Sequence, residues 1–519
     1  MPRSRQPYPV VDVFAGPGGL GEGFASLPGE RDGQVFHGTV AIERDEFSHR
    51  TLFLRHFLGC FPDGEFPDEY YSYLKGDLAI KDLYGAYASE FAEAGKSALR
   101  VSLGPESHAA VRRVIKKRLA DRKKWVLVGG PPCQAYSLVG RSRMMGQPGF
   151  EKDERHFLYK EYLKIIADHA PPVFVMENVK GLLSATVNGT PVINRILADL
   201  EHPRAALRGG DNGLSYKLYS LSEADVPGGA ADPRLFLVKA EDFGVPQARH
   251  RMFIVGIRSD LKTRPGLLRA HRGPTVRETI GNMPVIRSGL SKGGEDSAVR
   301  WYKEVERLSA IDIAGQLNGA PYSKAVTGDI KLRLRSGNSA PDERSSRVYP
   351  GRIAGRHRSL GGLHDPRLKV LTGHESRSHM ASDLRRYMYA AVFADVTGRS
   401  PKLSDFPRSL LPAHQNVELG RTGKMFSDRF RVQLADEVST TITSHISKDG
   451  HYFIHYDPAQ CRSLTVREAA RLQTFPDNYS FEGPRTSQYH QVGNAVPPYL
   501  ARQIAALVAE VLDSMKGEP

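Results

Sequence analysis

The first 43 residues contain a strand, a glycine-rich turn, a helix start and a second strand, and this order limits the possible folds most. Residues 8–14 are apolar and read as a buried strand, and residues 15–24 follow as a glycine-rich loop. Residues 36–42 form a second apolar run that ends at Glu43. An acidic residue at this place commonly binds the hydroxyls of a ribose. The pattern predicts a Rossmann-like α/β sheet that binds a nucleotide-like cofactor.

The glycine loop taken alone also fits an ordinary tight turn. Its glycines stand at positions 16, 18, 19 and 21, and this spacing differs from the dinucleotide pattern G-x-G-x-x-G. The cofactor interpretation therefore depends on the other strand ends of the chain.

A further short strand is predicted at residues 125–128. Gly-Gly-Pro-Pro stops it abruptly, and Cys133 follows. Neither glycine nor proline extends a strand well. Because open α/β sheets bind ligands at the carboxyl ends of their strands, a thiol at this place is a candidate nucleophile. A lone cysteine is more often a buried packing residue, and that alternative stays open at this point.

Polar side chains lie within or next to three further predicted strands. Residues 76–80 supply Asp77, although a helix cap or turn explains an aspartate there equally well. Residues 172–176 lead to Glu177 and Asn178, a candidate acid beside the thiol. Before the strand at 252–257, Arg249 and Arg251 alternate along an extended segment. We expect both on one face, where they suit an anion or a carboxylate.

Helical segments are expected between these strands. Residues 47–57 and 157–167 have helical periodicity, residues 85–124 read as a helical insertion, and a final apolar helix runs to residue 512. The insertion ends in a dense basic run at 112–124, which suits either a solvated face or phosphate contacts. Thr465 and Glu468 form a capping box, the signature of a helix start.

Residues 259–458 lose this rhythm and carry most of the positive charge. The chain has a formal net charge of +14, and this segment alone has 32 Lys and Arg against 21 Asp and Glu. We expect a second, loop-rich and partly β domain that binds a polyanion, although a basic solvated surface would show the same composition. Residues 439–443 and 452–455 predict a hairpin around a Lys-Asp-Gly turn.

The composition also excludes several classes of protein. No apolar run is long enough to span a bilayer, so we expect no membrane association. The three cysteines are too few for a disulfide framework, and their scatter does not match a zinc site. We therefore expect a reducing compartment and no metal.

Six segments together resemble the DNA cytosine-5 methyltransferase family of the bacterial restriction–modification type, and they occur in the family's order. They are residues 14–19, 131–137, 177–179, 247–251, 464–473 and 491–496. The resemblance implies a class I methyltransferase sheet with helices on both faces. It assigns residues 1–258 to the catalytic domain, 259–458 to target recognition, and 459–519 to a return segment that completes the catalytic domain.

The resemblance implies S-adenosylmethionine as the cofactor. Glu43 would bind the ribose and Asp77, with Leu78, the adenine. Ala495 stands where the family often has serine, which puts one hydroxyl contact in doubt. The full implied set of cofactor-binding residues is Phe14, Ala15, Gly16, Gly18, Gly19, Leu20, Glu43, Asp77, Leu78, Gly130, Pro132, Leu158, Asn494 and Ala495.

The catalytic residues implied by the resemblance are Cys133, Glu177, Asn178, Arg249 and Arg251. Cys133 would attack C6 of a flipped cytosine, and Glu177 would act as the general acid. Asn178 would hold the loop, and the two arginines would anchor the base or a phosphate. Residues that would lie near the DNA are Ser137, Arg141 and Arg143.

The resemblance leaves two alternatives: a tRNA cytosine-5 methyltransferase, and a non-catalytic DNA-binding regulator on the same fold. The long basic segment disfavours the first, because that branch of the family has a short one. The presence of Cys133, Glu177 and Arg251 disfavours the second. We expect a monomer acting on double-stranded DNA in a prokaryotic cytoplasm, associated with the nucleoid, with a cognate restriction endonuclease as a functional partner.

Overall fold

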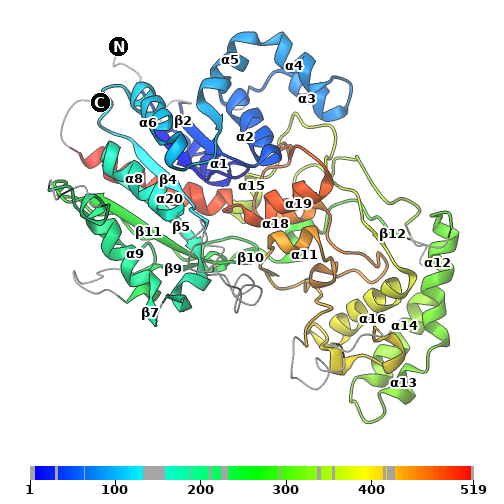
Figure 1. Ribbon diagram of the computed structural model, residues 1–519. Coiled ribbons are helices and arrows are strands. Elements are labelled where there is room, and N and C mark those ends of the chain that lie inside the picture. Colours follow the sequence, from blue (N-terminus) through cyan, green and yellow to red (C-terminus); the bar gives the residue numbers. More distant parts are fainter. Residues whose placement is uncertain are drawn as a thin grey trace.

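The computed structural model describes residues 6–29, 33–62, 65–132, 158–187, 189–207, 210, 213–223, 232–291, 294–335, 341–353, 357–412, 417 and 427–515. Its centre is an eight-stranded mixed sheet (Figure 1). Seven strands lie in the order β3-β2-β1-β4-β5-β11-β8, and β9 also pairs with β11. These strands are β1 Tyr8–Val13, β2 Phe36–Glu43, β3 Ala98–Arg100, β4 Val126–Gly129, β5 Val173–Val179, β8 Tyr216–Tyr219, β9 Leu237–Lys239 and β11 His250–Arg258.

Strand directions place one topological switch point at β1. The five strands from β3 to β5 run parallel, and β11 pairs antiparallel with β5, β8 and β9. The chain passes from β1 to β2 on one side and later returns to β4 on the other. Open sheets bind ligands in the crevice that forms at the carboxyl ends of strands at such a point. The predicted α/β sheet is confirmed.

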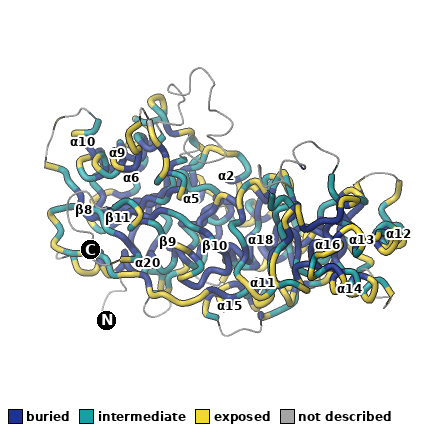
Figure 2. Tube along the Cα trace, turned by 90° about the horizontal axis from the view of Figure 1, so that it is seen from below, coloured by how far each residue is buried: buried dark blue, intermediate teal, exposed yellow. Residues whose placement is uncertain are grey.

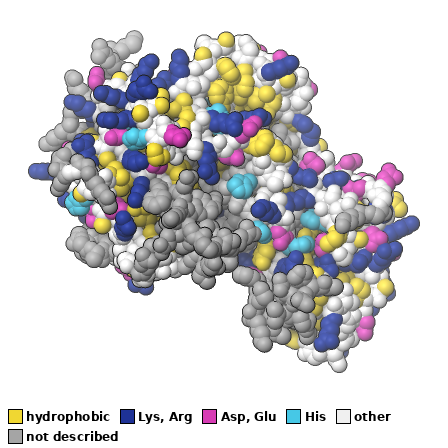
Figure 3. Space-filling view, in the orientation of Figure 1, with side chains coloured by type: hydrophobic (Ala, Val, Ile, Leu, Met, Phe, Trp, Pro, Cys, Tyr) yellow, Lys and Arg dark blue, Asp and Glu magenta, His cyan; other side chains and the backbone are white. Residues whose placement is uncertain are grey.

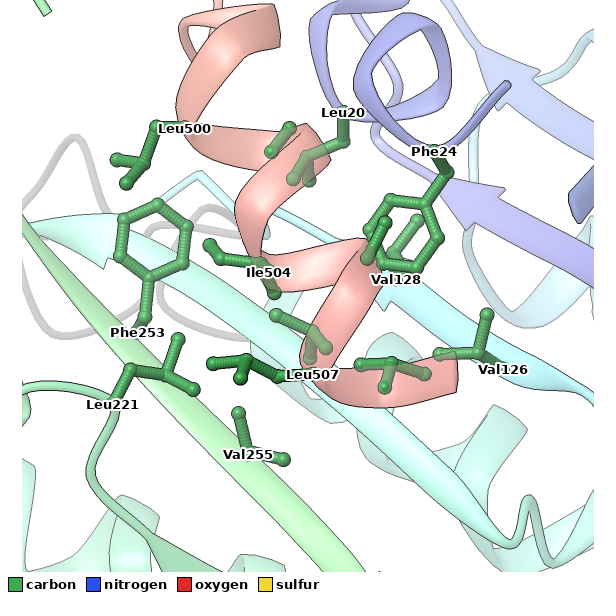
Figure 4. Close-up of a cluster of buried hydrophobic side chains, with 14 of the residues drawn as sticks. Leu20, Phe24, Val126, Val128, Leu221, Phe253, Val255, Leu500, Ile504 and Leu507 are labelled. Atoms are coloured by element: carbon green, nitrogen blue, oxygen red, sulfur yellow. The ribbon is translucent and has the colours of Figure 1, made fainter. Parts of the chain in front are cut away.

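Two hydrophobic clusters cover the two faces of the sheet, because successive strand residues point to opposite sides. In β4, Leu127 packs with one cluster, and Val126 and Val128 pack with the other. Figure 4 shows the second face, where Leu500, Ile504 and Leu507 of the last helix lie against Val126, Phe253 and Val255. The helices of this part of the chain are α1 Gly19–Ala25, α2 Glu46–Leu58, α6 Pro105–Leu119, α8 Leu158–His169, α9 Val192–Glu201, α10 Pro203–Ala206 and α20 Pro498–Ser514.

The predicted third strand at residues 76–80 is wrong. Gly76 ends helix α3 (Asp68–Lys75) in a left-handed conformation, and α4 (Ile80–Ala86) begins four residues later. The third strand is instead β3, three residues long, which follows α5 (Ala88–Ser97) inside the segment predicted as a helical insertion. A three-residue strand carries too little pattern to be found from sequence.

A second lobe, at the lower right of Figure 1, is built mainly from helices. Its hydrophobic cluster runs from Leu290 to Cys461 and includes Trp301 and Phe393. The lobe is more helical than the sequence suggested, and its strands β12 (Gly289–Leu290) and β13 (Ser378–His379) have two residues each. Its helices are α12 Ala298–Glu306, α13 Ile313–Gln316, α14 Ser323–Arg335 and α16 Ala381–Thr397.

Many charges of this lobe are neutralised within it. Arg333 pairs with Asp329 and Asp395, and Arg386 is buried against Asp383. The tyrosines that alternate with these arginines in sequence, such as Tyr387, lie in the core. On the face shown in Figure 3, Lys and Arg therefore stand among Asp and Glu over this lobe, whereas they gather more densely at the upper left, over α6.

The hairpin predicted between residues 439 and 455 is also wrong. The strand β14 (Ser439–Thr440) pairs in parallel with β10 (Gln247–Ala248), and short 3-10 helices cover residues 444–447 and 451–453. The amide of Ser439 donates to the carbonyl of Pro246 at 3.0 Å. The chain therefore runs alongside β10 here and does not turn back on itself.

A fourth hydrophobic cluster joins the two lobes. It contains Ile280 of α11 (Val276–Ile280) and Ile442 together with residues 464–495 of the return segment, which includes α18 (Val466–Leu472) and α19 (Arg485–Asn494). Figure 2 shows this buried layer running through α11 and α18 between the lobes. The domain boundaries at 258 and 458 stay a prediction, and the packing shows that residues 276–280 and 442–453 share a core with the return segment.

The start of α18 matches the predicted capping box. The side chain of Thr465 accepts from the amide of Glu468, and Glu468 Oε2 accepts from the amide of Thr465 at 2.7 Å. Both carboxylate oxygens of Glu468 also accept from Arg462, at 2.6 and 2.7 Å, and both side chains are 1% exposed. Burial alone would raise the pKa of Glu468, but Arg462 outweighs it and holds that pKa well below its usual range.

Replacing Glu468 by Gln should lower the free energy of unfolding by about 3–5 kcal/mol, because the buried Arg462 loses its counter-charge. The folded pKa lies below the unfolded value, so this contribution is present at neutral pH and is lost as the pH falls below about 4. Urea unfolding at pH 7 and at about pH 2 measures both effects, because the loss continues down to the folded pKa. The exposed Glu437, paired with Arg272 at 3.3 Å, is the control, and E437Q should cost less than about 1 kcal/mol. An equal loss for the two variants would contradict this.

Candidate active site

A cavity of about 710 Å³ opens at the carboxyl ends of the parallel strands, on the switch point at β1. This volume lies within the range of small-molecule and cofactor sites. The strand ends contribute Phe14 after β1, Glu43 from β2, Gly130 after β4 and Glu177 from β5. Further lining residues from the predicted set are Ala15, Gly16, Gly19, Leu20, Pro132, Leu158, Asn178, Arg251, Asn494 and Ala495.

The glycine loop forms the floor of the cavity. Gly16 and Gly18 have φ angles of 59° and 98°, and Phe14 adopts the same left-handed region with φ of 59°. Such a conformation costs a non-glycine residue about 1–3 kcal/mol and is typical of functional sites. A Cβ on Gly19 would lie 2.4 Å from the carbonyl oxygen of Val496. Glycine is therefore required where the return segment crosses the loop.

Glu43 links the loop to the end of β2. Its Oε2 accepts from the amide of Gly16 at 2.9 Å, and its Oε1 accepts from the amides of Arg44 and Asp45 at 2.8 and 2.7 Å. These bonds fix the carboxylate at the cavity wall. A carboxylate has about four acceptor sites, so Glu43 retains capacity for one hydroxyl of a ligand.

The loop after β4 lies close to Glu177. A Cβ on Gly130 would stand 2.9 Å from Glu177 Oε2, so only glycine lets the carboxyl group approach this backbone. Pro132 also lines the cavity and is the last described residue before the gap. Cys133, the predicted nucleophile, is the next residue of the chain and lies outside the described residues, as do Ser137, Arg141 and Arg143.

Glu177 and Arg251 form an ion pair at the cavity wall. Arg251 stands opposite Val179 in the antiparallel pair of β11 and β5, which puts its side chain diagonal to that of Glu177. Arg251 Nε lies 3.0 Å from Glu177 Oε1, and the side chains are 14% and 13% exposed. Burial raises the pKa of Glu177, and Arg251 and Arg249 only partly offset it. The carboxyl group therefore holds a proton more readily than an ordinary glutamate does.

Asn178 ties this acid to the loop before Cys133. Its Nδ2 donates to the carbonyl of Pro131 at 3.1 Å, and its Oδ1 accepts from the amide of Val179 at 2.9 Å. The Asn178 side chain is buried, and its hydrogen bond to Pro131 holds the loop in position.

Arg249 does not line the cavity, whereas Arg251 does. It lies between β10 and β11 and is 1% exposed. Its guanidinium donates to the carbonyls of Ile442 at 2.8 Å and Gly493 at 3.1 Å. These two contacts join residues 442 and 493 to the sheet, and the role of Arg249 as an anchor for the base or a phosphate stays a prediction.

Three other predicted cofactor residues do not line the cavity. Asp77 and Leu78 follow α3 in a turn, and Gly18 faces a smaller pocket of about 80 Å³ behind the loop. In place of Asp77, the end of β3 brings Val101, Ser102 and Leu103 to the cavity. No sequence pattern predicted this, because β3 is only three residues long.

The return segment closes the cavity from the side of α19. Asn494 and Ala495 line it as predicted, and so do His490 and Gln491, which were not predicted. Asn494 Nδ2 lies 3.1 Å from His490 Nδ1. The i, i+4 spacing on a helix could have identified His490 once Asn494 was proposed.

Comparisons with known proteins identify the family. Residues 86–510 match the model of the C-5 cytosine-specific DNA methylase family. A type II methyltransferase of Bacillus paralicheniformis, M.Bpa9945I, is 31% identical over 97% of this chain and 99% of its own length. A DNA (cytosine-5-)-methyltransferase of Aeropyrum pernix, M.ApeKI, is 28% identical over 75% of this chain and 82% of its own. The type II methyltransferase M.DdeI of Desulfomicrobium norvegicum is 25% identical over 74% and 72%.

Among the described residues, no helix has the length and apolar character needed to cross a bilayer.

The match to the family model covers most of the chain, from the segment before β3 to the last helix, and the similarity to M.Bpa9945I covers nearly all of it. The chain belongs to the C-5 cytosine-specific DNA methylase family.

Proposed function

We propose that this chain transfers a methyl group from S-adenosylmethionine to C5 of cytosine in duplex DNA. The observation that carries the proposal is the Glu177–Arg251 pair, which stands beside Gly130 at the wall of a cofactor-sized cavity that Pro132 also lines. An acid with a raised pKa is thereby held next to the residue that directly precedes a cysteine.

The residues that line the cavity fit the proposed cofactor. Glu43 would accept from a ribose hydroxyl, and the backbone of the glycine loop would lie under the chain that joins ribose and amino acid. Asn494 would close the opposite side. When bound, S-adenosylmethionine supplies a methyl group activated by its sulfonium.

Cytosine C5 is a poor nucleophile, and covalent catalysis solves this problem. The thiolate of Cys133 adds to C6 and makes C5 electron-rich. After methyl transfer, loss of the C5 proton expels Cys133 and restores the ring. The reaction therefore requires a low thiol pKa or a nearby base.

Glu177 would supply the proton that the ring needs while the thiolate adds. The raised pKa of its carboxyl group suits a general acid for N3 of cytosine. Arg251, at 3.0 Å, would hold the carboxyl group in place and stabilise the negative charge that Glu177 carries after proton transfer.

DNA is the substrate that the composition and the fold both support. A base inside a duplex cannot reach the cavity, so the target cytosine must be flipped out of the helix. The +11 segment at 259–458 would supply phosphate contacts and read the sequence. The monomeric state, the association with a nucleoid and the cognate restriction endonuclease stay predictions.

The nucleophile is tested by trapping. Duplex DNA in which 5-fluorocytosine replaces cytosine should form a denaturant-stable complex with the wild-type protein only when S-adenosylmethionine is present, because fluorine cannot leave as the C5 proton does. C133S should form none. C60S is the control, since Cys60 packs near His56 outside the cavity, and it should trap normally. Trapping by C133S would contradict the proposal.

The acid is tested by E177Q, which keeps the shape of the side chain but cannot deliver a proton. We expect kcat to fall by about 10²–10⁴-fold. Calorimetric affinity for S-adenosylhomocysteine should change less than about threefold, since Glu177 is not proposed to bind the cofactor; such a change is under 1 kcal/mol. The variant E241Q, which changes the partly buried partner of His250 outside the cavity, should leave kcat unchanged. A kcat for E177Q near the wild-type value would show that Glu177 is not the acid.

A further inference from the structure

The order of the strands fixes the direction in which the cofactor lies along the cavity; this step rests on the proposed function. The reacting methyl group must lie near β4 and β5, which carry Pro132 and Glu177. The ribose must lie near Glu43 at the end of β2. Because the strand order is β3-β2-β1-β4-β5, the purine extends beyond Glu43 to the end of β3.

At that end of the cavity, the chain that follows β3 presents a serine hydroxyl and not a carboxylate. The amide of Val101 donates to the carbonyl of Glu43 at 3.2 Å, which brings the chain after β3 alongside the ribose position. Ser102 follows and lines the cavity. Its carbonyl accepts from Ser107 Oγ at 2.7 Å, whereas its own hydroxyl has no hydrogen bond within the described part of the chain.

Two carboxylates also reach this end of the cavity, and both have partners. Glu46 pairs with Arg50 and, at 3.4 Å, with Arg100. Asp45 caps helix α2, where its Oδ1 accepts from the amide of Ser48 at 2.8 Å. Asp77, the acid expected from sequence, does not line the cavity.

We propose that the hydroxyl of Ser102 contacts position 6 of the purine. A hydroxyl accepts from a 6-amino group and donates to a 6-oxo group equally well, whereas a carboxylate only accepts. This site therefore distinguishes adenine from hypoxanthine only weakly, and an acidic residue at position 102 would make the distinction strong.

Calorimetry with S-adenosylhomocysteine and its 6-oxo analogue, S-inosylhomocysteine, tests this without any turnover. The wild-type protein should bind the two within about tenfold of each other, since each forms one neutral hydrogen bond. S102D should prefer S-adenosylhomocysteine by about 30-fold or more, because the 6-oxo group would face an acceptor that it cannot satisfy. S102A should weaken both ligands by a similar factor.

D77N and D45N are the matched controls, and D45N keeps the helix cap because asparagine also serves at that position. Both should bind both ligands like the wild type. A wild-type preference above about 50-fold that either control abolishes would overturn the role of Ser102, and so would an S102D variant that shows no new preference. E43Q should weaken both ligands alike. Failure of the wild type to bind either ligand would overturn the cofactor site itself together with this inference.

Discussion

The cavity depends on the return of the chain's last 30 residues to its first 30. Helix α20 packs across the sheet face against Leu20 and Phe24, and the segment before it crosses the glycine loop. The contact is so close that a Cβ on Gly19 would meet Val496 and one on Gly23 would meet Ala501 at 2.3 Å. The shape of the cofactor floor is thus set from behind by residues almost 480 positions away. Because Arg249 also donates to Gly493, the sheet, the loop and the second lobe are held at one point.

The same region packs the second lobe against the return segment, so the lobe does not have a separate core at this boundary. Residues 276–280 and 442–453 share a core with α18 and α19, and the buried Glu468–Arg462 pair caps that layer. A movement of the second lobe would therefore act on Asn494 and Ala495, which line the cavity.

Much of the fold could be predicted from the sequence, and the failures have physical reasons. Strands β1, β2, β4, β5 and β11 were predicted because long apolar runs end in glycine, proline or charge. Strand β3 was missed because three residues carry no period, and with it the cavity-lining residues Val101, Ser102 and Leu103 were missed. The burial of Arg249 was not predicted, because spacing in sequence does not show burial. The second lobe was read as loop-rich because α16 is buried on most sides, which removes the amphipathic pattern.

The most direct test is the identity of the methylated base. Duplex DNA incubated with the protein and S-adenosylmethionine can be digested to nucleosides and analysed by mass spectrometry. The geometry of Glu177, Arg251 and the loop leading to Cys133 predicts 5-methylcytosine, and none with C133S. Methylation of a ring amino group, or 5-methylcytosine in tRNA but not in duplex DNA, would contradict the account.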